Sequence, residues 1–241
     1  MLSGVSFALG EGELCGLIGP NGCGKSTLLK AILDIGPAWT GAIHMRGQDS
    51  RGMTRMERAR LLSFLPQEYG TSSRLTALET VLLGRHPHRE AWEADSKEDV
   101  QVAREYMDLV GVGDLAGRSF SELSGGERRL VMLAAALAQQ PRVLLLDEPG
   151  SSLDFRHTVD MWRLLGELSS RGITVLASTH ELNIAGRYLD SVLVLSGGRC
   201  MAFGSPGAVC TPELLSSVFG VSLRVQDDGE GGFFVLPVQA R

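Results

Sequence analysis

A chain of 241 residues with 44% hydrophobic side chains can bury a sizeable core, as one large domain or two closely joined ones. Its formal net charge of −5 argues against a nucleic-acid partner, because such a surface usually carries a basic stripe. The longest apolar run, residues 130–138, is shorter than the roughly 18 residues of a membrane-spanning helix, so no membrane crossing is expected.

Five short apolar segments are predicted to be buried strands, and each ends in a turn or a polar group. They are residues 13–19, 61–67, 143–149, 173–179 and 191–198. Longer amphipathic segments alternate with them, which is the pattern of an α/β protein with a largely parallel sheet. Because a parallel sheet carries its ligand loops at the carboxyl ends of its strands, these polar ends are candidate site residues.

The pattern between residues 72 and 140 is helical. Residues 76–85, 98–112 and the stretch after 127 repeat apolar side chains at helical spacing, and no strand-like run separates them. We therefore expect residues 1–71 and 141–204 to form an α/β core with a β subdomain, and residues 72–140 to form an inserted helical subdomain. Residues 205–241 are expected to be a C-terminal tail, with a helix at 211–220, a polar link at 227–232 and a strand at 233–238.

The compartment is predicted from the N-terminus and the cysteines. Glu11 and Glu13 interrupt the first apolar stretch and no basic segment precedes them, so no secretory signal is expected. The four cysteines show no zinc-type spacing and are interpreted as reduced thiols of a cytosolic protein. They are Cys15, Cys23, Cys200 and Cys210.

Residues 19–27, GPNGCGKST, lie between a predicted strand and a predicted helix, which is the position of a phosphate-binding loop. Glycines let the backbone turn its N–H groups toward a phosphate, and the helix N-terminus adds a favourable dipole. Lys25 can reach the β- and γ-phosphates, while the Ser26 hydroxyl can bind Mg²⁺. A chance glycine-rich turn is disfavoured by the number of matching positions. The candidate nucleotide-binding residues are Gly19, Pro20, Asn21, Gly22, Cys23, Gly24, Lys25, Ser26 and Thr27.

Two adjacent carboxylates follow the predicted strand in VLLLDEP. Asp147 at the strand end is placed to hold Mg²⁺, directly or through water. Glu148 is the next residue, so its side chain is expected to point elsewhere, where it can accept a proton from an attacking water. A solvated turn is the alternative interpretation of this pair, and the phosphate-binding loop upstream disfavours it.

These motifs together resemble one family. GPNGCGKST, Gln67 in LPQ, LSGGE at 123–127, VLLLDEP, SSLD at 151–154 and His180 in STHEL occur in the order found in ATP-binding cassette (ABC) ATPases. The resemblance covers nearly the whole chain. It implies an α/β P-loop NTPase fold, with a RecA-like core, an N-terminal antiparallel β subdomain and an inserted helical subdomain. It also implies ATP and Mg²⁺ as cofactors and a head-to-tail homodimer, in which each LSGGE segment closes over the ATP held by the other subunit.

The LSGGE segment is suited to that use. Ser124 offers a hydroxyl, Gly125 and Gly126 allow close backbone approach, and the helix that follows presents its positive end to a γ-phosphate. Glu127 completes the candidate nucleotide contact. An alternative role for the serine is a simple helix N-cap, which does not explain both glycines.

Three further residues are assigned by the resemblance. Gln67 resembles the Q-loop glutamine, which senses Mg²⁺ and the attacking water. His180 resembles the switch histidine that hydrogen-bonds the γ-phosphate, and Asp154 resembles the D-loop aspartate that crosses the dimer interface. Taken singly, Gln67 could be a polar residue at a strand exit, His180 a loop histidine and Asp154 a helix N-cap. The expected catalytic residues are Glu148, His180, Gln67 and Lys25, and the expected metal ligands are Ser26, Gln67 and Asp147.

The chain departs from the family pattern in three places. Family members usually have a further strand and an adenine-stacking aromatic upstream of residues 5–7, where this chain has only MLSG. Either the start is truncated or another group covers the adenine. Arg129 and Leu130 stand where glutamine and arginine are common, so the chain departs from the family at its contacts to the facing ribose. Cys23 replaces a usual alanine or serine.

Residues 75–89, 181–190 and 211–221 resemble the ATPases of importers for iron-siderophore complexes, haem and cobalamin. That resemblance implies integral-membrane permease subunits, an indirect link to a substrate-binding protein, and a peripheral position on the cytoplasmic face of the membrane. His86 and His88 have no third ligand nearby and are expected in a surface loop. The alternatives are an ABC-type regulatory or binding switch without a permease, and a P-loop kinase, which LSGGE disfavours.

Overall fold

The computed structural model describes residues 1–36, 38–68, 70, 74–90, 93–227, 229 and 232–238. Contacts within the chain divide it into two compact units. The first unit comprises Met1–Trp39, Leu146–Gly150 and Thr158–Arg241, and the second comprises Thr40–Leu145 and Ser151–His157. The second unit therefore contains the predicted helical segment 72–140 together with residues 40–71 and 141–145. The finer partition into subdomains stays a prediction.

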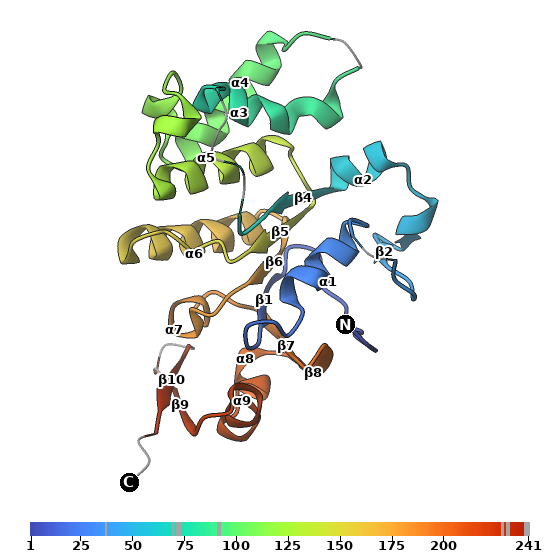
Figure 1. The fold of residues 1–241 in the computed structure, drawn as a ribbon, viewed down its shortest axis with the longest axis vertical. Helices are drawn as coiled ribbons and strands as arrows, with labels where there is room; N and C mark the ends of the chain where they lie inside the picture. Colours follow the sequence, from blue (N-terminus) through green and yellow to red (C-terminus); the bar gives the residue numbers. More distant parts are fainter. Residues whose placement is uncertain are drawn as a thin grey trace. The chain divides into compact units, whose positions relative to one another are not determined.

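The first unit is built on a largely parallel sheet (Figure 1). Strand β1 pairs in parallel with β6 on one side and β7 on the other, while β8 is antiparallel to β7. Every residue of β1 and β6 is buried, as expected for strands covered on both faces. The elements are β1 (Leu14–Ile18), α1 (Lys25–Ile32), β6 (Thr174–Ser178), α7 (Leu182–Ala185), β7 (Ser191–Ser196), β8 (Arg199–Gly204), α8 (Pro206–Val209), α9 (Pro212–Phe219) and all of α6 (Phe155–Ser170) except its first three residues, which belong to the second unit. Strand β5 (Val143–Asp147) lies across the division between the units.

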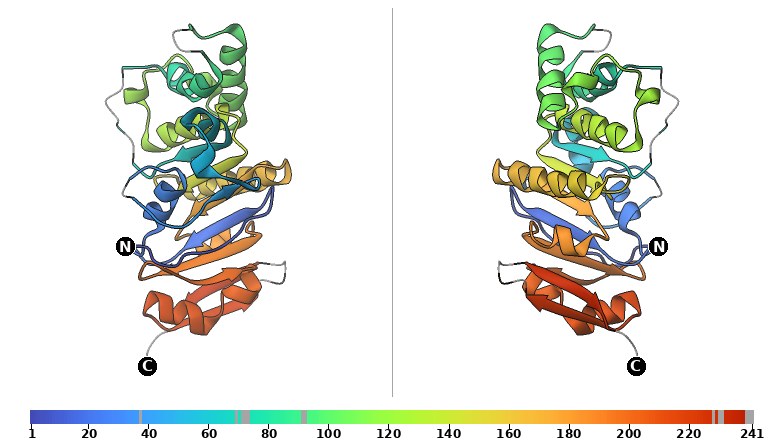
Figure 2. Two further views of the ribbon diagram at one scale, coloured as in Figure 1. Left: turned by 90° about the vertical axis from the view of Figure 1, so that its right-hand side faces the viewer. Right: turned by 90° about the vertical axis from the view of Figure 1, so that its left-hand side faces the viewer.

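The C-terminal part of the first unit ends in a hairpin of β9 (Leu223–Asp227) and β10 (Phe233–Pro237). Figure 2 shows this hairpin beside α9, which contacts β9. The side chain of Asn183 in α7 holds the outer edge of β10, because its amide donates to the Val235 carbonyl and its oxygen accepts from the Val235 N–H. The predicted helix and strand of the tail are confirmed. Part of the predicted link 227–232 lies outside the described residues.

The second unit is mostly helical and contains a short antiparallel hairpin. Its elements are β2 (His44–Met45), β3 (Gln48–Asp49), η1 (Ser50–Gly52), α2 (Arg55–Leu61), β4 (Leu62–Leu65), α3 (Ala77–Leu82), η2 (Leu83–His88), α4 (Lys97–Leu109), η3 (Gly113–Leu115), η4 (Phe120–Glu122) and α5 (Gly125–Ala138). Helices α2, α3, α4 and α5 each begin with a reciprocal capping box, which satisfies two backbone donors at each start. Helices α3, α4 and α5 pack against one another.

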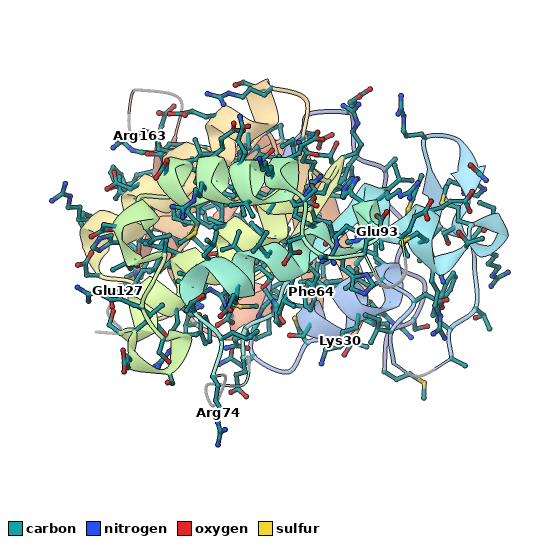
Figure 3. The ribbon with its side chains drawn as sticks, turned by 90° about the horizontal axis from the view of Figure 1, so that it is seen from above. Lys30, Phe64, Arg74, Glu93, Glu127 and Arg163 are labelled. Atoms are coloured by element: carbon teal, nitrogen blue, oxygen red, sulfur yellow. The ribbon has the colours of Figure 1, made fainter. Side chains whose placement is uncertain are left out.

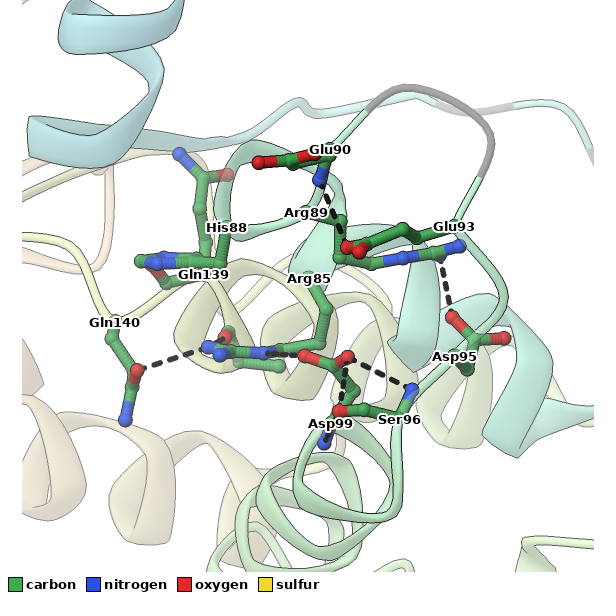
Figure 4. Close-up of polar contacts among 11 residues, drawn as sticks. Arg85, His88, Arg89, Glu90, Glu93, Asp95, Ser96, Asp99, Gln139 and Gln140 are labelled. Carbon is green, nitrogen blue, oxygen red and sulfur yellow. Dashed lines mark hydrogen bonds and ion pairs between the residues drawn. The ribbon is translucent and has the colours of Figure 1, made fainter.

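A buried ion pair joins three parts of this helical region (Figure 4). The Arg85 guanidinium of η2 donates from Nε to Asp99 Oδ1 at 2.9 Å, and from Nη1 to the Ala138 carbonyl at 2.8 Å and Gln140 Oε1 at 2.9 Å. Asp99 also belongs to the capping box of α4 with Ser96. One arginine thus binds the start of α4 and the end of α5.

The chain has a mixed α/β fold with a parallel sheet core and additional antiparallel strands. All five predicted strands are confirmed as β1, β4, β5, β6 and β7. Residues 1–13 form no strand. The antiparallel pairs among the described residues are β2–β3, β7–β8 and β9–β10. Within the described part of the chain, no helix is long and apolar enough to cross a membrane.

Candidate functional site

The loop between β1 and α1 has the backbone of a phosphate cradle. Gly19, Gly22 and Gly24 have φ values of 153°, 76° and 111°, a region that favours glycine. At Gly19 a Cβ would lie 2.1 Å from the Leu195 carbonyl oxygen, so no larger residue fits without displacing β7. The tight turn therefore depends on glycine for conformation and for space.

Lys25 and the start of α1 supply the positive end of this loop. Lys25 is only 7% exposed, and its ammonium donates to the Gly19 carbonyl at 2.8 Å, with the Pro20 carbonyl at 3.4 Å. Gly24 caps α1 and gives its first turn no side-chain hydrogen bond. Backbone N–H groups at an uncapped helix start suit a bound phosphate. Cys23 is buried within the loop.

Asp147 and Glu148 share one partner, Ser178 at the end of β6. The Ser178 hydroxyl donates to Asp147 Oδ1 at 2.6 Å and accepts from the Glu148 N–H at 2.9 Å. Glu148 has φ 51°, a left-handed conformation that costs energy for a non-glycine residue. The two carboxylates have different partners, because Asp147 accepts from Ser178 while Glu148 Oε1 lies near His180. Sequence reasoning did not identify Ser178, whose one signal was a serine at the end of a buried strand.

His180 and Glu148 come together in the first unit. His180 Nδ1 lies 3.7 Å from Glu148 Oε1. The His180 side chain is 60% exposed and that of Glu148 only 13% exposed. An exposed ring beside a mostly buried carboxylate is a suitable arrangement for a group that must reach a ligand. The structure therefore places a predicted base and a predicted γ-phosphate contact next to each other.

In the second unit, LSGGE forms the start of α5. The Ser124 hydroxyl accepts from the Glu127 N–H, and the Glu127 carboxylate accepts from the Ser124 N–H at 2.7 Å, which confirms the N-cap interpretation. The hydrogen bond from the Ser124 N–H, with a smaller contribution from its hydroxyl, lowers the pKa of Glu127. Figure 3 labels Glu127 at this helix end. A Cβ at Gly125 or Gly126 would come no closer than 3.5 Å to its neighbours, so packing within the chain does not require either glycine.

The segment after β4 is held by Arg129 of α5. Arg129 is 1% exposed, and its Nη1 donates to the Pro66 carbonyl at 2.5 Å and the Gln67 carbonyl at 3.3 Å. The Gln67 side chain itself is exposed. Leu130 is half-buried. The unusual arginine at 129 thus has a structural partner in its own chain, which the sequence did not reveal.

Asp154 begins α6 as an N-cap. Its Oδ1 accepts from the His157 N–H at 2.8 Å and contacts His157 Nδ1 at 2.8 Å. The backbone hydrogen bond from His157 lowers the pKa of Asp154. The plainer interpretation of this residue is therefore correct, and its side chain remains 66% exposed and accessible to a partner.

The predicted magnesium ligands are divided between the units. Ser26 and Asp147 belong to the first unit and Gln67 to the second. A carboxylate and a hydroxyl are oxygen donors of the kind that Mg²⁺ prefers, usually with phosphate oxygens and water. Among the described residues, no group of three or more His, Cys, Asp or Glu side chains could hold a metal.

The sequence matches proteins of established families. A model described as ABC transporter matches residues 2–151. A hemin import ATP-binding protein from Pseudomonas fluorescens is 39% identical, over 96% of this chain and 91% of its own length. A ferric enterobactin transport ATP-binding protein from Escherichia coli is 35% identical, over 95% and 84%. A cobalamin import ATP-binding protein from Halobacterium salinarum is 36% identical, and this chain spans 61% of its length.

Solved structures show the same fold. A metal-chelate type ABC transporter in an inward-facing conformation has a TM-score of 0.85 at 30% identity, over 99% of this chain and 91% of the other. A dimeric bacterial ABC transporter cassette has a TM-score of 0.76 at 28% identity, over 85% and 90%.

Proposed function

The chain belongs to the ABC transporter family, and from this premise we propose that it is the ATP-binding and hydrolysing subunit of an importer. The cargo class would be an iron-siderophore, haem or cobalamin-type chelate, because the similar proteins are named for these cargoes. The Glu148 site carries the proposal. Glu148 lies on a strained turn whose backbone N–H is held by Ser178, and its mostly buried carboxylate lies 3.7 Å from His180, an arrangement suited to chemistry at a phosphate.

The loop at 19–27 binds the nucleotide phosphates in this proposal. The N–H groups of the turn and of the first turn of α1 donate to phosphate oxygens. Lys25 exchanges its contacts to the Gly19 and Pro20 carbonyls for the β- and γ-phosphates. A Mg²⁺ ion bound with the nucleotide would neutralise developing phosphate charge. Ser26, Asp147 and Gln67 are its proposed protein ligands.

Hydrolysis would use two neighbouring side chains, Glu148 after β5 and His180 after β6. Glu148 orients the attacking water and accepts its proton, while the His180 ring hydrogen-bonds the γ-phosphate. Ser178 keeps Asp147 and Glu148 in different orientations, because it binds a carboxylate oxygen of the first and the backbone N–H of the second. Gln67 would sense the metal and the water from the second unit.

The LSGGE segment completes the site only across a homodimer in this proposal. Neither glycine is required by packing within the chain, which leaves their small size available for a nucleotide bound to a second copy. Asp154 would lie at the same interface. The dimer would couple to membrane permease subunits on the cytoplasmic face of the membrane, and through them to a substrate-binding protein.

The test uses Glu148→Gln, which removes the proton acceptor and keeps the side-chain shape. We expect ATP turnover to fall by at least about 100-fold while ATP binding persists, because general-base catalysis is worth about 10²–10⁴ in rate. Size-exclusion chromatography with ATP is expected to show a trapped dimer. As the matched control, Glu167→Gln changes an exposed carboxylate on α6, away from the proposed site, and should leave turnover unchanged. Undiminished turnover in Glu148→Gln would overturn its assignment as the base.

A further inference from the structure

Glu181, the residue after His180, is fixed through both its main chain and its side chain. Its backbone N–H donates to Thr179 Oγ1 at 2.9 Å, and its carbonyl accepts from N–H groups at the start of α7. Its Oε2 accepts from Nε1 of Trp162 at 3.3 Å. Trp162 is fully buried on α6. The carboxylate therefore attaches the segment that carries His180 to the core of the first unit.

The same carboxylate fills the space beside Gly150, two residues after Glu148. A Cβ at position 150 would lie 2.2 Å from Glu181 Oε2 and 2.9 Å from Glu181 Cδ. These distances are far inside van der Waals contact, so a side chain at 150 and the observed position of Glu181 exclude each other. Gly150 is not among the glycines with positive φ, so its backbone conformation does not require glycine. The requirement comes from the space that the Glu181 carboxylate occupies.

We propose that Glu181 is a positioning residue that holds the His180 segment against the segment carrying Glu148, and that glycine at 150 is required to admit it. The His180 side chain is 60% exposed, so packing around its ring does not fix it. The backbone on either side must do so, and Glu181 supplies that anchor. The proposal rests on the proposed ATP hydrolysis, in which His180 and Glu148 act together.

A double-mutant cycle with His180 tests whether Glu181 acts through it. Glu181→Ala is expected to lower kcat by about 10- to 100-fold, the cost of misplacing a reacting group by about 1 Å, with little change in KM for ATP. Glu181→Gln keeps an acceptor for Trp162 and should retain most activity. In a His180→Ala background, Glu181→Ala should cause no further loss. An equal loss in both backgrounds would mean that Glu181 is merely structural.

A second double-mutant cycle pairs Gly150→Ala with Glu181→Ala. Gly150→Ala is expected to displace Glu181 and lower kcat as Glu181→Ala does, whereas the double variant should be no worse than either single one. Gly166→Ala on α6 is the matched control, because its Cβ would meet Tyr188 at an ordinary 3.7 Å. A Gly150→Ala enzyme with full activity would contradict the proposal.

The fluorescence of Trp162 tests its contact with Glu181 without an ATPase measurement. The chain has three tryptophans, so Trp39→Phe with Trp92→Phe leaves Trp162 as the reporter. Glu181→Ala and Gly150→Ala should each shift its emission, and Gly166→Ala should not. An unchanged spectrum in Glu181→Ala would refute the contact. If the wild-type chain hydrolyses no ATP, the proposed function fails on its own, and the spectrum still decides the position of Glu181.

Discussion

Arg85→Met removes the guanidinium that joins η2, α4 and α5 and keeps a similar apolar stem. The substitution breaks three hydrogen bonds, to Asp99, the Ala138 carbonyl and Gln140. The Arg85 and Asp99 side chains are 6% and 8% exposed, so water cannot replace the lost donors. Removing one partner of a buried pair costs about 3–5 kcal/mol, because the other charge is left uncompensated.

The charge on Asp99 decides most of that cost. In an Asp99→Asn background no buried carboxylate remains, so Arg85→Met should cost only about 1–2 kcal/mol for lost hydrogen bonds. Arg89→Met is the matched control in the same region (Figure 4). Its ion pair with Asp95 is 23% and 38% exposed, and the expected loss is below about 1 kcal/mol.

Equilibrium urea unfolding measures these differences, and hydrogen exchange in α4 and α5 assigns them to the second unit. A cost for Arg85→Met no larger than that of Arg89→Met would refute the reasoning. So would an equal cost in the Asp99→Asn background, because the interaction would then not depend on the charge.

The same pair predicts a pH dependence. Burial alone would raise the pKa of Asp99, but hydrogen bonds from Ser96 and Arg85 outweigh it and lower the pKa to about 2. Stability from a lowered carboxyl pKa is present above the unfolded value, near 3.8, and is lost as the pH falls toward 2. The loss is about 2 kcal/mol between pH 5 and pH 2, measured as wild type against Asp99→Asn. An equal loss of stability with falling pH in the wild type and in Asp99→Asn would contradict this prediction.

Three further substitutions test the site. Ser178→Ala should lower ATP turnover by at least about tenfold, because it leaves Asp147 and the Glu148 N–H without their shared partner; steady-state ATPase rates at full activity would exclude that role. Lys25→Met should weaken ATP binding by about 10- to 100-fold, the range of a charge-assisted hydrogen bond, in a fluorescent-nucleotide titration; unchanged affinity would show that Lys25 does not contact the phosphates. Arg129→Met should speed amide hydrogen exchange at Gln67 and Glu68 and destabilise the second unit by about 1–3 kcal/mol, with unaltered exchange counting against it.

Local motifs could be interpreted from the sequence because their chemistry is short-range. The motifs at 19–27, 123–127 and 147–148 are each contiguous in the chain, and the capping box of Ser124 with Glu127 forms within one helical turn. Five strands were also predictable, since burial on both faces makes a parallel strand continuously apolar. The order of the motifs indicated the family.

Contacts between distant residues were decided only by the tertiary structure. Ser178 reaches Asp147 and Glu148 across 31 and 30 positions, and Arg129 reaches Gln67 across 62. Nothing local distinguishes Ser178 from any other serine at a strand end, or Arg129 from a surface arginine on a helix. Glu181 and Gly150 became meaningful only when the fold placed a carboxylate where a Cβ would be. The physical reason is that periodicity reports burial and backbone conformation, whereas the partner of a buried polar group is chosen by the packing of whole elements.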